Sequence, residues 1–205
     1  MKTQTVQLID AGTGNLQSVF NALQNLGAEI RLVSDSADFH EDAKTILPGV
    51  GAFRHFMQGL IGRGLVAPIL RVVQLGIPLL GICVGMQAML TSSEEMGDTP
   101  GLGIIPGMVK RFPDQLAEKV PHTGWNEITH DGSSPLLKSI PTGSYFYFNH
   151  SYFCQPVSSN HSLAITDYIL PYSSVVVNGS VYGVQFHPEK SQKLGQQLLQ
   201  NFLDL

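Results

Sequence analysis

The chain is organised around one stretch, Pro78-Leu79-Leu80-Gly81-Ile82-Cys83-Val84-Gly85-Met86-Gln87. Residues 78–82 form an apolar run that predicts a short parallel strand covered on both faces. Cys83 follows between two glycines, and residues 86–90 favour a helix. A strand, a tight turn and a helix with a nucleophile at the apex form a nucleophile elbow. A buried structural cysteine in a core strand is the alternative reading of the same residues.

Two properties of this stretch suit Cys83 to nucleophilic chemistry. Gly81 and Gly85 carry no Cβ, and a strained, closely packed turn needs that freedom. The helix that follows points its free N–H groups and the positive end of its dipole at the sulfur, which favours the thiolate.

A second motif lies near the other end of the chain. Residues 180–186 predict a strand that runs into His187-Pro188-Glu189. Proline keeps His187 extended, and residues two apart in an extended segment point the same way, so Glu189 can lie beside the imidazole. Cys83, His187 and Glu189 then have the residue types of a nucleophile, a base and an orienting acid. A His-x-Glu metal site is the rival interpretation, but further nearby ligands are lacking.

A loop of proline and glycine predicts part of the same site. Thr45-Ile46-Leu47 favours a strand, and Pro48-Gly49-Val50-Gly51 favours a loop at its carboxyl end, beside the elbow, where open α/β sheets bind ligands. We expect backbone N–H groups of Val84 and of the Val50–Gly51 peptide to hold an oxyanion. A plain turn is the alternative.

These motifs resemble the triad-type (class I) glutamine amidotransferases. Finer features are similar to the glutaminase subunits of imidazole glycerol phosphate synthase, an enzyme of histidine biosynthesis. The features that carry this similarity are Ile9-Asp10-Ala11-Gly12-Thr13-Gly14-Asn15-Leu16, Pro48-Gly49-Val50-Gly51-Ala52-Phe53, His122-Thr123-Gly124-Trp125-Asn126, Asn149-His150-Ser151-Tyr152 and His187-Pro188-Glu189-Lys190-Ser191. Ala11 and Asn149 depart from the pattern, and Asn149 is more like the glutaminase of carbamoyl phosphate synthetase.

The resemblance implies a reaction and a partner. The reaction is the hydrolysis of L-glutamine to glutamate and ammonia through a thioester on Cys83, without a metal or organic cofactor. By resemblance, Gln87 and the backbone around Ser151 and Tyr152 hold the α-amino and carboxylate groups of glutamine. The partner is a (β/α)₈-barrel cyclase subunit that receives the ammonia in a heterodimer. A glutaminase of pyridoxal phosphate synthesis, a γ-glutamyl hydrolase and a mainly regulatory binding subunit stay open as alternatives.

Composition narrows the class of protein. A length of 205 residues fits a single domain over residues 1–205. A net charge of −4 and the lack of a basic cluster argue against nucleic-acid binding. The chain starts without a signal-peptide pattern, and the apolar region 65–90 is interrupted by Arg71, Gln74 and several Gly and Pro residues, so we expect a cytoplasmic protein without a membrane span. Of the two cysteines, Cys154 is interpreted as a plain buried thiol.

The order of the segments predicts the fold class. The first half alternates between strands at 6–9, Glu29–Val33 and 45–47 and helices that include Leu16 to Leu26 and parts of 65–75. Gly12-x-Gly14 is not a dinucleotide fingerprint, because Gln17 stands where a third glycine is needed. The second half has short strands at 104–109, 125–128, 145–149, 152–156, 163–167, 173–177 and 181–186, with a type I′ hairpin signal at Asn178-Gly179. An amphipathic helix carrying Leu194, Leu198 and Phe202 follows, with Ser191 as its cap.

We therefore predict an α/β fold with a mixed, mostly parallel central sheet flanked by helices and additional antiparallel strands, as in class I glutamine amidotransferases. His122, Trp125 and His150 are interpreted as packing residues rather than site residues.

Overall fold

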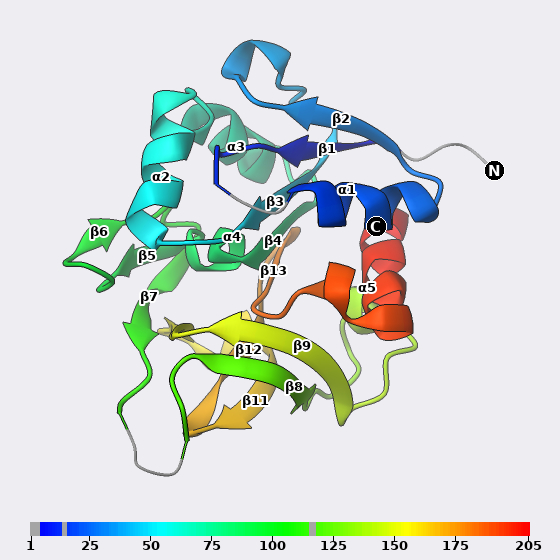
Figure 1. Cartoon of the computed structure of the whole chain (residues 1–205). Coiled ribbons are helices and arrows are strands. Elements are labelled where there is room, and N and C mark those ends of the chain that lie inside the picture. Colours follow the sequence, from blue (N-terminus) through cyan, green and yellow to red (C-terminus); the bar gives the residue numbers. More distant parts are fainter. Residues whose placement is uncertain (1–4, 14–15, 115–117) are drawn as a thin grey trace.

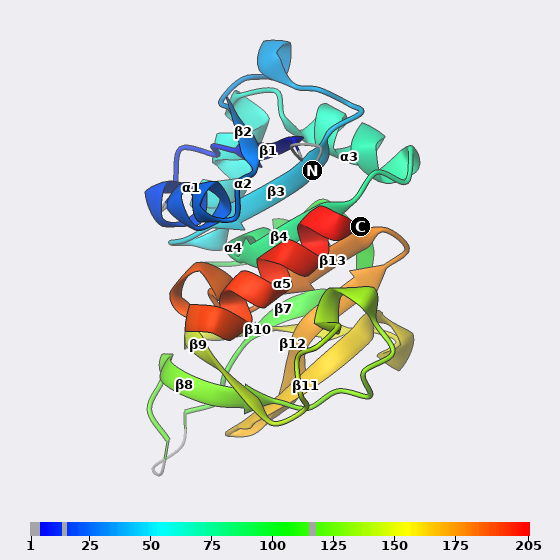
Figure 2. The same ribbon diagram turned by 90° about the vertical axis from the view of Figure 1, so that its right-hand side faces the viewer.

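The fold is built on one long mixed sheet with helices on both faces (Figures 1 and 2). A computed structural model describes residues 5–13, 16–114 and 118–205. The sheet has the order β2-β1-β3-β4-β13-β12-β10-β7-β5-β6, with β11 also paired to β12, and β8 and β9 form a separate two-stranded sheet. Gly14 and Asn15 of the first glycine motif lie outside the described residues.

The bounds of the strands are β1 (Thr5–Ile9), β2 (Glu29–Val33), β3 (Lys44–Gly49), β4 (Leu79–Cys83), β5 (Leu90–Ser93), β6 (Thr99–Pro100), β7 (Ile105–Arg111), β8 (His122–Ile128), β9 (Ser144–His150), β10 (Tyr152–Pro156), β11 (Ser162–Tyr168), β12 (Leu170–Asn178) and β13 (Val181–Val184). The α-helices are α1 (Leu16–Asn25), α2 (Phe53–Gly62), α3 (Val66–Gln74), α4 (Val84–Gln87) and α5 (Gln192–Asp204).

The half of the sheet that carries the elbow is parallel. β1 pairs with β2 and β3, β3 with β4, and β4 with β13, all in parallel. Helices α1 and α5 cover one face of this half, and α2 and α3 cover the other (Figure 2). All five residues of β4 are buried, which explains why its sequence is apolar throughout rather than alternating.

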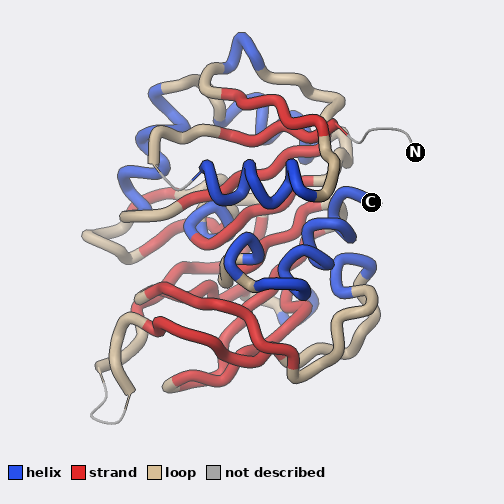
Figure 3. The backbone as a smooth tube through the Cα atoms, turned by 45° about the vertical axis from the view of Figure 1, so that its right-hand side comes forward, coloured by secondary structure: helices blue, strands red, loops and turns tan. Residues whose placement is uncertain are grey.

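The second half of the chain supplies the antiparallel part. β12 pairs antiparallel with β13, β10 and β11, and β10 pairs antiparallel with β7. The β8–β9 pair lies beside β11, to which it is joined by a bridge between Thr129 and Ile165 (Figure 3). The predicted fold class is therefore confirmed: a mixed α/β sheet, flanked by helices, with additional antiparallel strands.

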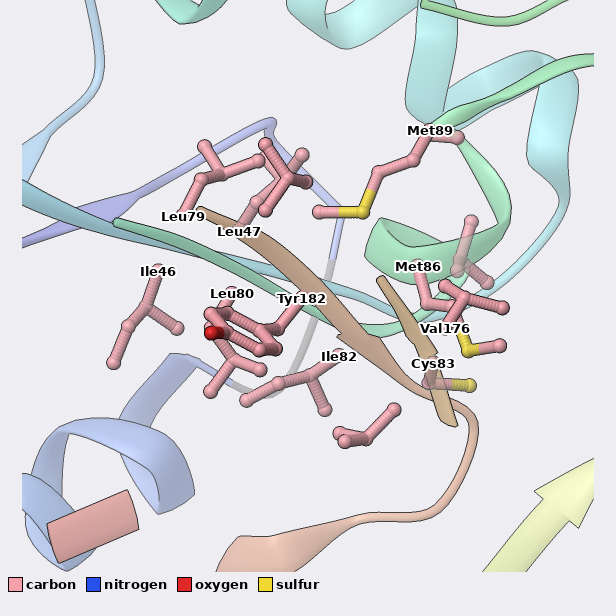
Figure 4. Packing of buried hydrophobic residues seen from close by; sticks show 14 of the residues in the cluster. Ile46, Leu47, Leu79, Leu80, Ile82, Cys83, Met86, Met89, Val176 and Tyr182 are labelled. Atoms are coloured by element: carbon pink, nitrogen blue, oxygen red, sulfur yellow. The ribbon is translucent and has the colours of Figure 1, made fainter. Parts of the chain in front are cut away.

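Close packing fixes the elbow strand in the middle of the core. Figure 4 shows Leu79, Leu80 and Ile82 beside Ile46, Leu47 and Tyr182, with Cys83 at the end of the strand. The three β4 side chains are at most 1% exposed. Burying each such side chain stabilises the fold by about 1.5–3 kcal/mol, so β4 is a rigid base for the residue that follows it.

Several local predictions are corrected. Pro48 and Gly49 belong to β3 and pair with Ile82 and Cys83, so only Val50 and Gly51 of the predicted loop leave the sheet. The helix predicted at residues 86–90 is the single turn α4, because Leu90 already begins β5. The sequence reading missed α2, β5 and β6. The loop that joins β12 to β13 is Gly179–Ser180, and only Gly179 has a positive φ, so the turn is not type I′.

Among the described residues, no single helix is long and apolar enough to cross a membrane. Helices α2 and α3 reach the required length and apolar composition only when they are taken together, and the chain bends by 90° between them. The prediction of one domain over residues 1–205 stays a prediction.

Candidate active site

Cys83 occupies a strained apex between β4 and α4. Its backbone has φ 55° and ψ −112°, a conformation that non-glycine residues rarely adopt. A Cβ at Gly85 would lie 1.8 Å from the carbonyl oxygen of Leu47, and one at Gly81 would lie 2.7 Å from the carbonyl oxygen of Gly85. The turn therefore needs glycine at both positions, as the elbow pattern predicts.

His187 and Glu189 meet through a turn rather than along an extended strand. Pro188–Lys190 is a 3₁₀ turn that brings Oε1 of Glu189 to 2.8 Å from Nδ1 of His187. The predicted contact is present, but the expected geometry is corrected, because β13 ends at Val184. The two side chains are 5% and 2% exposed, so the pair is almost fully withdrawn from water.

The protonation of His187 is set by its two neighbours. Burial lowers its pKa, but hydrogen bonds to Cys83 and Glu189 outweigh that effect and raise the pKa to about 10. His187 is therefore an imidazolium at neutral pH and faces the sulfur with a positive charge. Because α4 is only one turn long, its dipole is a weaker source of positive potential than the predicted longer helix.

Ser191 holds the backbone of His187. Its Oγ donates to the carbonyl oxygen of His187 at 2.6 Å and accepts from the N–H of Tyr147 at 3.0 Å. The N–H of His187 donates to the carbonyl oxygen of Tyr147 at 2.9 Å. Ser191 is the N-cap residue of α5, as predicted, but its side chain makes no capping hydrogen bond.

A cavity of about 290 Å³ opens at Cys83 and His187. That volume suits a ligand the size of a free amino acid. Eight of the ten residues expected at the site line it, namely Cys83, His187, Val50, Gly51, Val84, Gln87, Ser151 and Tyr152. Glu189 and Gly49 lie behind this wall, around a small neighbouring cavity.

Gln87 is tied into the wall of the cavity by both of its N–H groups. Nε2 donates to the carbonyl oxygen of Tyr152 at 3.0 Å and to Oε1 of Gln185 at 3.1 Å. Gln185 in turn donates from Nε2 to the sulfur of Cys83, at 3.7 Å. Since an amide nitrogen carries two protons, Gln87 has only its oxygen left to offer a ligand, and that oxygen accepts hydrogen bonds.

The cavity also contains residues that the sequence reading did not place there: Glu95, Pro121, Asn149, His150 and Lys190. His150 was interpreted as packing; it is buried, but it also lines the cavity. Asn149 and Lys190 belong to the family motifs, and this membership could have predicted that they line the cavity. Glu95 and Pro121 lie outside those motifs, and no feature of the sequence predicted their position.

His122 and Trp125 were also interpreted as packing residues, and their burial differs. His122 is buried, whereas Trp125 is 46% exposed, so the interpretation is wrong for Trp125. Cys154 is buried and free, as expected, and burial raises the pKa of its thiol.

Comparison with known proteins settles the family. Residues 7–205 match the family model described as glutamine amidotransferase class-I. The chain belongs to the class-I glutamine amidotransferases. As a member of that family it is a glutamine amidotransferase enzyme.

Individual relatives are similar over almost their whole length. The imidazole glycerol phosphate synthase subunit HisH of Dehalococcoides mccartyi (strain CBDB1) is 46% identical over 200 residues, which cover 98% of this chain and 97% of that protein. The subunit of the same name from Syntrophotalea carbinolica is 43% identical over 205 residues, covering 98% and 100%.

Solved structures share the fold of this glutamine amidotransferase. A structure described as a glutamine amidotransferase aligns with a TM-score of 0.75 and 20% identity over 97% of both chains. A chain of the PurLQS structure from Thermotoga maritima aligns with a TM-score of 0.76 and 16% identity, covering 100% of this chain and 99% of that one.

Proposed function

We propose that the chain is the glutaminase subunit of imidazole glycerol phosphate synthase, a cytoplasmic enzyme of histidine biosynthesis. It hydrolyses L-glutamine to glutamate and ammonia and passes the ammonia to a cyclase subunit. The observation that carries the proposal is the buried constellation of Cys83, His187 and Glu189, of which Cys83 and His187 line an amino-acid-sized cavity. The similarity to HisH subunits over nearly the full chain supports the choice of pathway.

The first half-reaction forms a thioester. The sulfur of Cys83 attacks the carboxamide carbon of glutamine as a thiolate, which the neighbouring imidazolium of His187 favours. The C–N bond then breaks, and His187 gives its proton to the departing nitrogen, so that ammonia leaves and a γ-glutamyl thioester remains. Glu189 accepts the Nδ1–H bond and keeps the ring oriented throughout.

The second half-reaction releases glutamate. His187 is now neutral and takes a proton from a water molecule, whose oxygen attacks the thioester carbon. The C–S bond breaks, and Cys83 leaves as the thiolate paired with the imidazolium, which restores the starting state. In both steps the negative oxygen is held by the N–H of Val84 and an N–H of the Val50–Gly51 peptide, and Gly49 gives the strand its close approach to the elbow.

Substrate recognition follows from the donors and acceptors that line the cavity. The free oxygen of Gln87 accepts from the α-ammonium group of glutamine, and backbone groups of Ser151 and Tyr152 complete the recognition of its α-amino and carboxylate groups. No cofactor takes part in this scheme.

A partner follows from the chemistry of the product. Ammonia released into water at neutral pH is mostly protonated and no longer nucleophilic, so it must be passed on directly. We propose a heterodimer with a (β/α)₈-barrel cyclase, and that cyclase binding turns the Val50–Gly51 peptide so that it completes the oxyanion site. A missing oxyanion donor typically costs about 10²–10³ in rate, so the subunit alone would be nearly silent.

The test is glutamine turnover by the purified chain, alone and with the cyclase and its nucleotide ligand. We expect at least a hundredfold activation by the complex, and stoichiometric labelling of Cys83 by a glutamine-analogue diazoketone. Full activity without the cyclase would contradict the coupling. Cleavage of γ-glutamyl peptides in preference to glutamine would point to a hydrolase instead.

A further inference from the structure

Two buried histidines have no part in the mechanism above, and one of them, His150, lines the cavity. His122 begins β8 and His150 ends β9, directly opposite each other, with 3% and 6% of their surfaces exposed. Nδ1 of His122 lies 3.2 Å from Nε2 of His150. The ring of His122 is stacked between those of Phe148 and Tyr168, with centroids 4.8 and 3.9 Å away, so its orientation is fixed.

The position of one proton follows from the backbone. Nδ1 of His150 lies 2.7 Å from the carbonyl oxygen of Tyr152, which can only accept, so His150 carries its proton on Nδ1. Burial lowers the pKa of His150 to about 3, which makes the ring neutral at neutral pH and leaves Nε2 as a bare acceptor.

The remaining protons follow from the groups around Nε2 of His150, which has one lone pair and needs a donor. Nδ1–H of His122 donates either directly to this nitrogen, at 3.2 Å, or to the oxygen of Tyr172, at 3.3 Å, whose hydroxyl then donates to Nε2 of His150 at 3.1 Å. His122 carries its proton on Nδ1 in both cases. His122 is also neutral, because burial lowers its pKa to about 4, so its Nε2 is an acceptor and receives Nδ2–H of Asn126 at 3.3 Å. The amide of Asn126 is itself oriented, since its oxygen accepts from the N–H of Glu127.

The series of hydrogen bonds from Asn126 through His122 and His150 ends at the carbonyl oxygen of Tyr152, which also contacts a side chain of the cavity wall. The carbonyl oxygen of Tyr152 accepts from both His150 and Gln87, and Gln87 continues through Gln185 to the sulfur of Cys83. If the donor from His150 is lost, only Gln87 still donates to this carbonyl among these two side chains, so the carbonyl and the side chain of Gln87 are both held less firmly at the wall of the cavity.

We propose that His150 is a positioning residue for glutamine binding, held in its Nδ1–H form by His122 and Asn126. It acts by fixing the Tyr152 carbonyl and, through it, the side chain of Gln87. This inference rests on the proposed function, because it concerns the same pocket. It implies that loss of the Nδ1–H donor weakens glutamine binding more than it slows the chemistry, since Cys83, His187 and Glu189 are untouched.

The kinetic test uses the complex with the cyclase. His150→Phe removes both ring nitrogens, and we expect KM for glutamine to rise about 10- to 100-fold while kcat falls less than about threefold. His150→Asn keeps an N–H near the position of Nδ1 and should restore most of the affinity. His161→Phe is the matched control, because it removes an equivalent Nδ1 contact with a backbone carbonyl, that of Val177, away from the cavity, and should leave KM unchanged. An unchanged KM in a folded His150→Phe variant would overturn the proposal.

A second measurement is independent of turnover and of how well the variants fold. Nitrogen NMR of the imidazole rings in the wild-type chain should show both His122 and His150 protonated on Nδ1, the form that free histidine disfavours. A proton on Nε2 of His150 would refute the proposed path. If the wild-type complex does not turn over glutamine, the proposed function fails, and the NMR result still decides whether this hydrogen-bond path exists.

Discussion

Gly49 lies directly opposite Cys83 in the neighbouring parallel strands β3 and β4. This pairing sets the strand that leads to Val50 and Gly51 against Cys83, so the proposed oxyanion loop and the thiol are fixed by the same sheet. The position of Gly49 leaves no room for a side chain. A Cβ on Gly49 would lie 2.8 Å from the backbone nitrogen of Gly85 and 2.6 Å from the ring of Phe56.

Gly49→Ala should therefore destabilise the protein by about 1–3 kcal/mol, because backbone must shift to admit the methyl group. Glutamine turnover should fall as well, since the shift moves the elbow. The matched control is Gly62→Ala at the end of α2, where a Cβ meets nothing within 4 Å. That change should be neutral or stabilise by up to about 1 kcal/mol. Urea unfolding of both variants measures the difference, and equal stabilities would contradict the role of the close approach.

Cys83→Ala and Cys83→Gly should both abolish thioester formation from labelled glutamine. The order of their free energies of unfolding should be the reverse of the ordinary order for alanine and glycine, or the two should be equal. At an ordinary position glycine is about 0.4–1 kcal/mol less stable than alanine. With φ at 55°, alanine retains backbone strain that glycine relieves, so the glycine variant should be at least as stable as the alanine variant. Thermal and urea unfolding provide the comparison. Thioester accumulation in either variant would rule Cys83 out as the nucleophile.

His187→Asn should damage turnover more than Glu189→Gln. Losing a general acid–base group typically costs about 10²–10⁴ in rate, whereas Glu189 acts through the orientation of His187. Single-turnover kinetics with saturating glutamine separates the two variants. A more severe defect in Glu189→Gln would mean that the carboxylate does more than orient the ring.

The pKa of His187 should depend on Cys83. Burial alone would lower it, and the hydrogen bond to Cys83 is foremost among the interactions that raise it to about 10. In Cys83→Ala the ring should consequently titrate at lower pH than in the wild type, and Glu189→Gln should lower the pKa by a smaller amount. An NMR titration of the His187 ring gives both values directly. Unchanged titration in Cys83→Ala would show that the thiol and the ring do not interact.

Folding stability should fall on the acid side because of His122 and His150. Their pKa values in the folded protein, about 4 and about 3, lie below the ordinary value of 6.5. The contribution of the two neutral rings to the free energy of unfolding is therefore fully present above pH 6.5. It is lost as the pH falls towards 4 for His122 and towards 3 for His150, by about 1.4 kcal/mol per pH unit for each ring. The double variant His122→Asn/His150→Asn should show a flatter decline between pH 6 and 4 in urea unfolding. The same slope in the double variant and the wild type would contradict the low pKa values.

The sequence by itself determined the elbow, the residue types of the proposed triad and the fold class. These are local properties. A short apolar run marks a strand covered on both faces, glycine marks a turn that no Cβ can enter, and proline fixes the residue before it. The strands Glu29–Val33 and Tyr152–Pro156 were predicted with their observed bounds for the same reason.

Only the tertiary structure decided how distant segments share one site. The bond from the N–H of Tyr147 to Ser191, the bond from Gln87 to the carbonyl of Tyr152 and the inclusion of Glu95 in the cavity depend on contacts between segments far apart in the chain. The pairing of His122 with His150 shows the reason. A buried polar atom must find a partner wherever the fold provides one, and His150, which lies beside His122 in the fold, is 28 residues away from it in the chain. The hydrogen bonds of Gln87, His122 and His150 therefore depend on how β8, β9 and β10 lie relative to the elbow, and the sequence around each residue does not specify them.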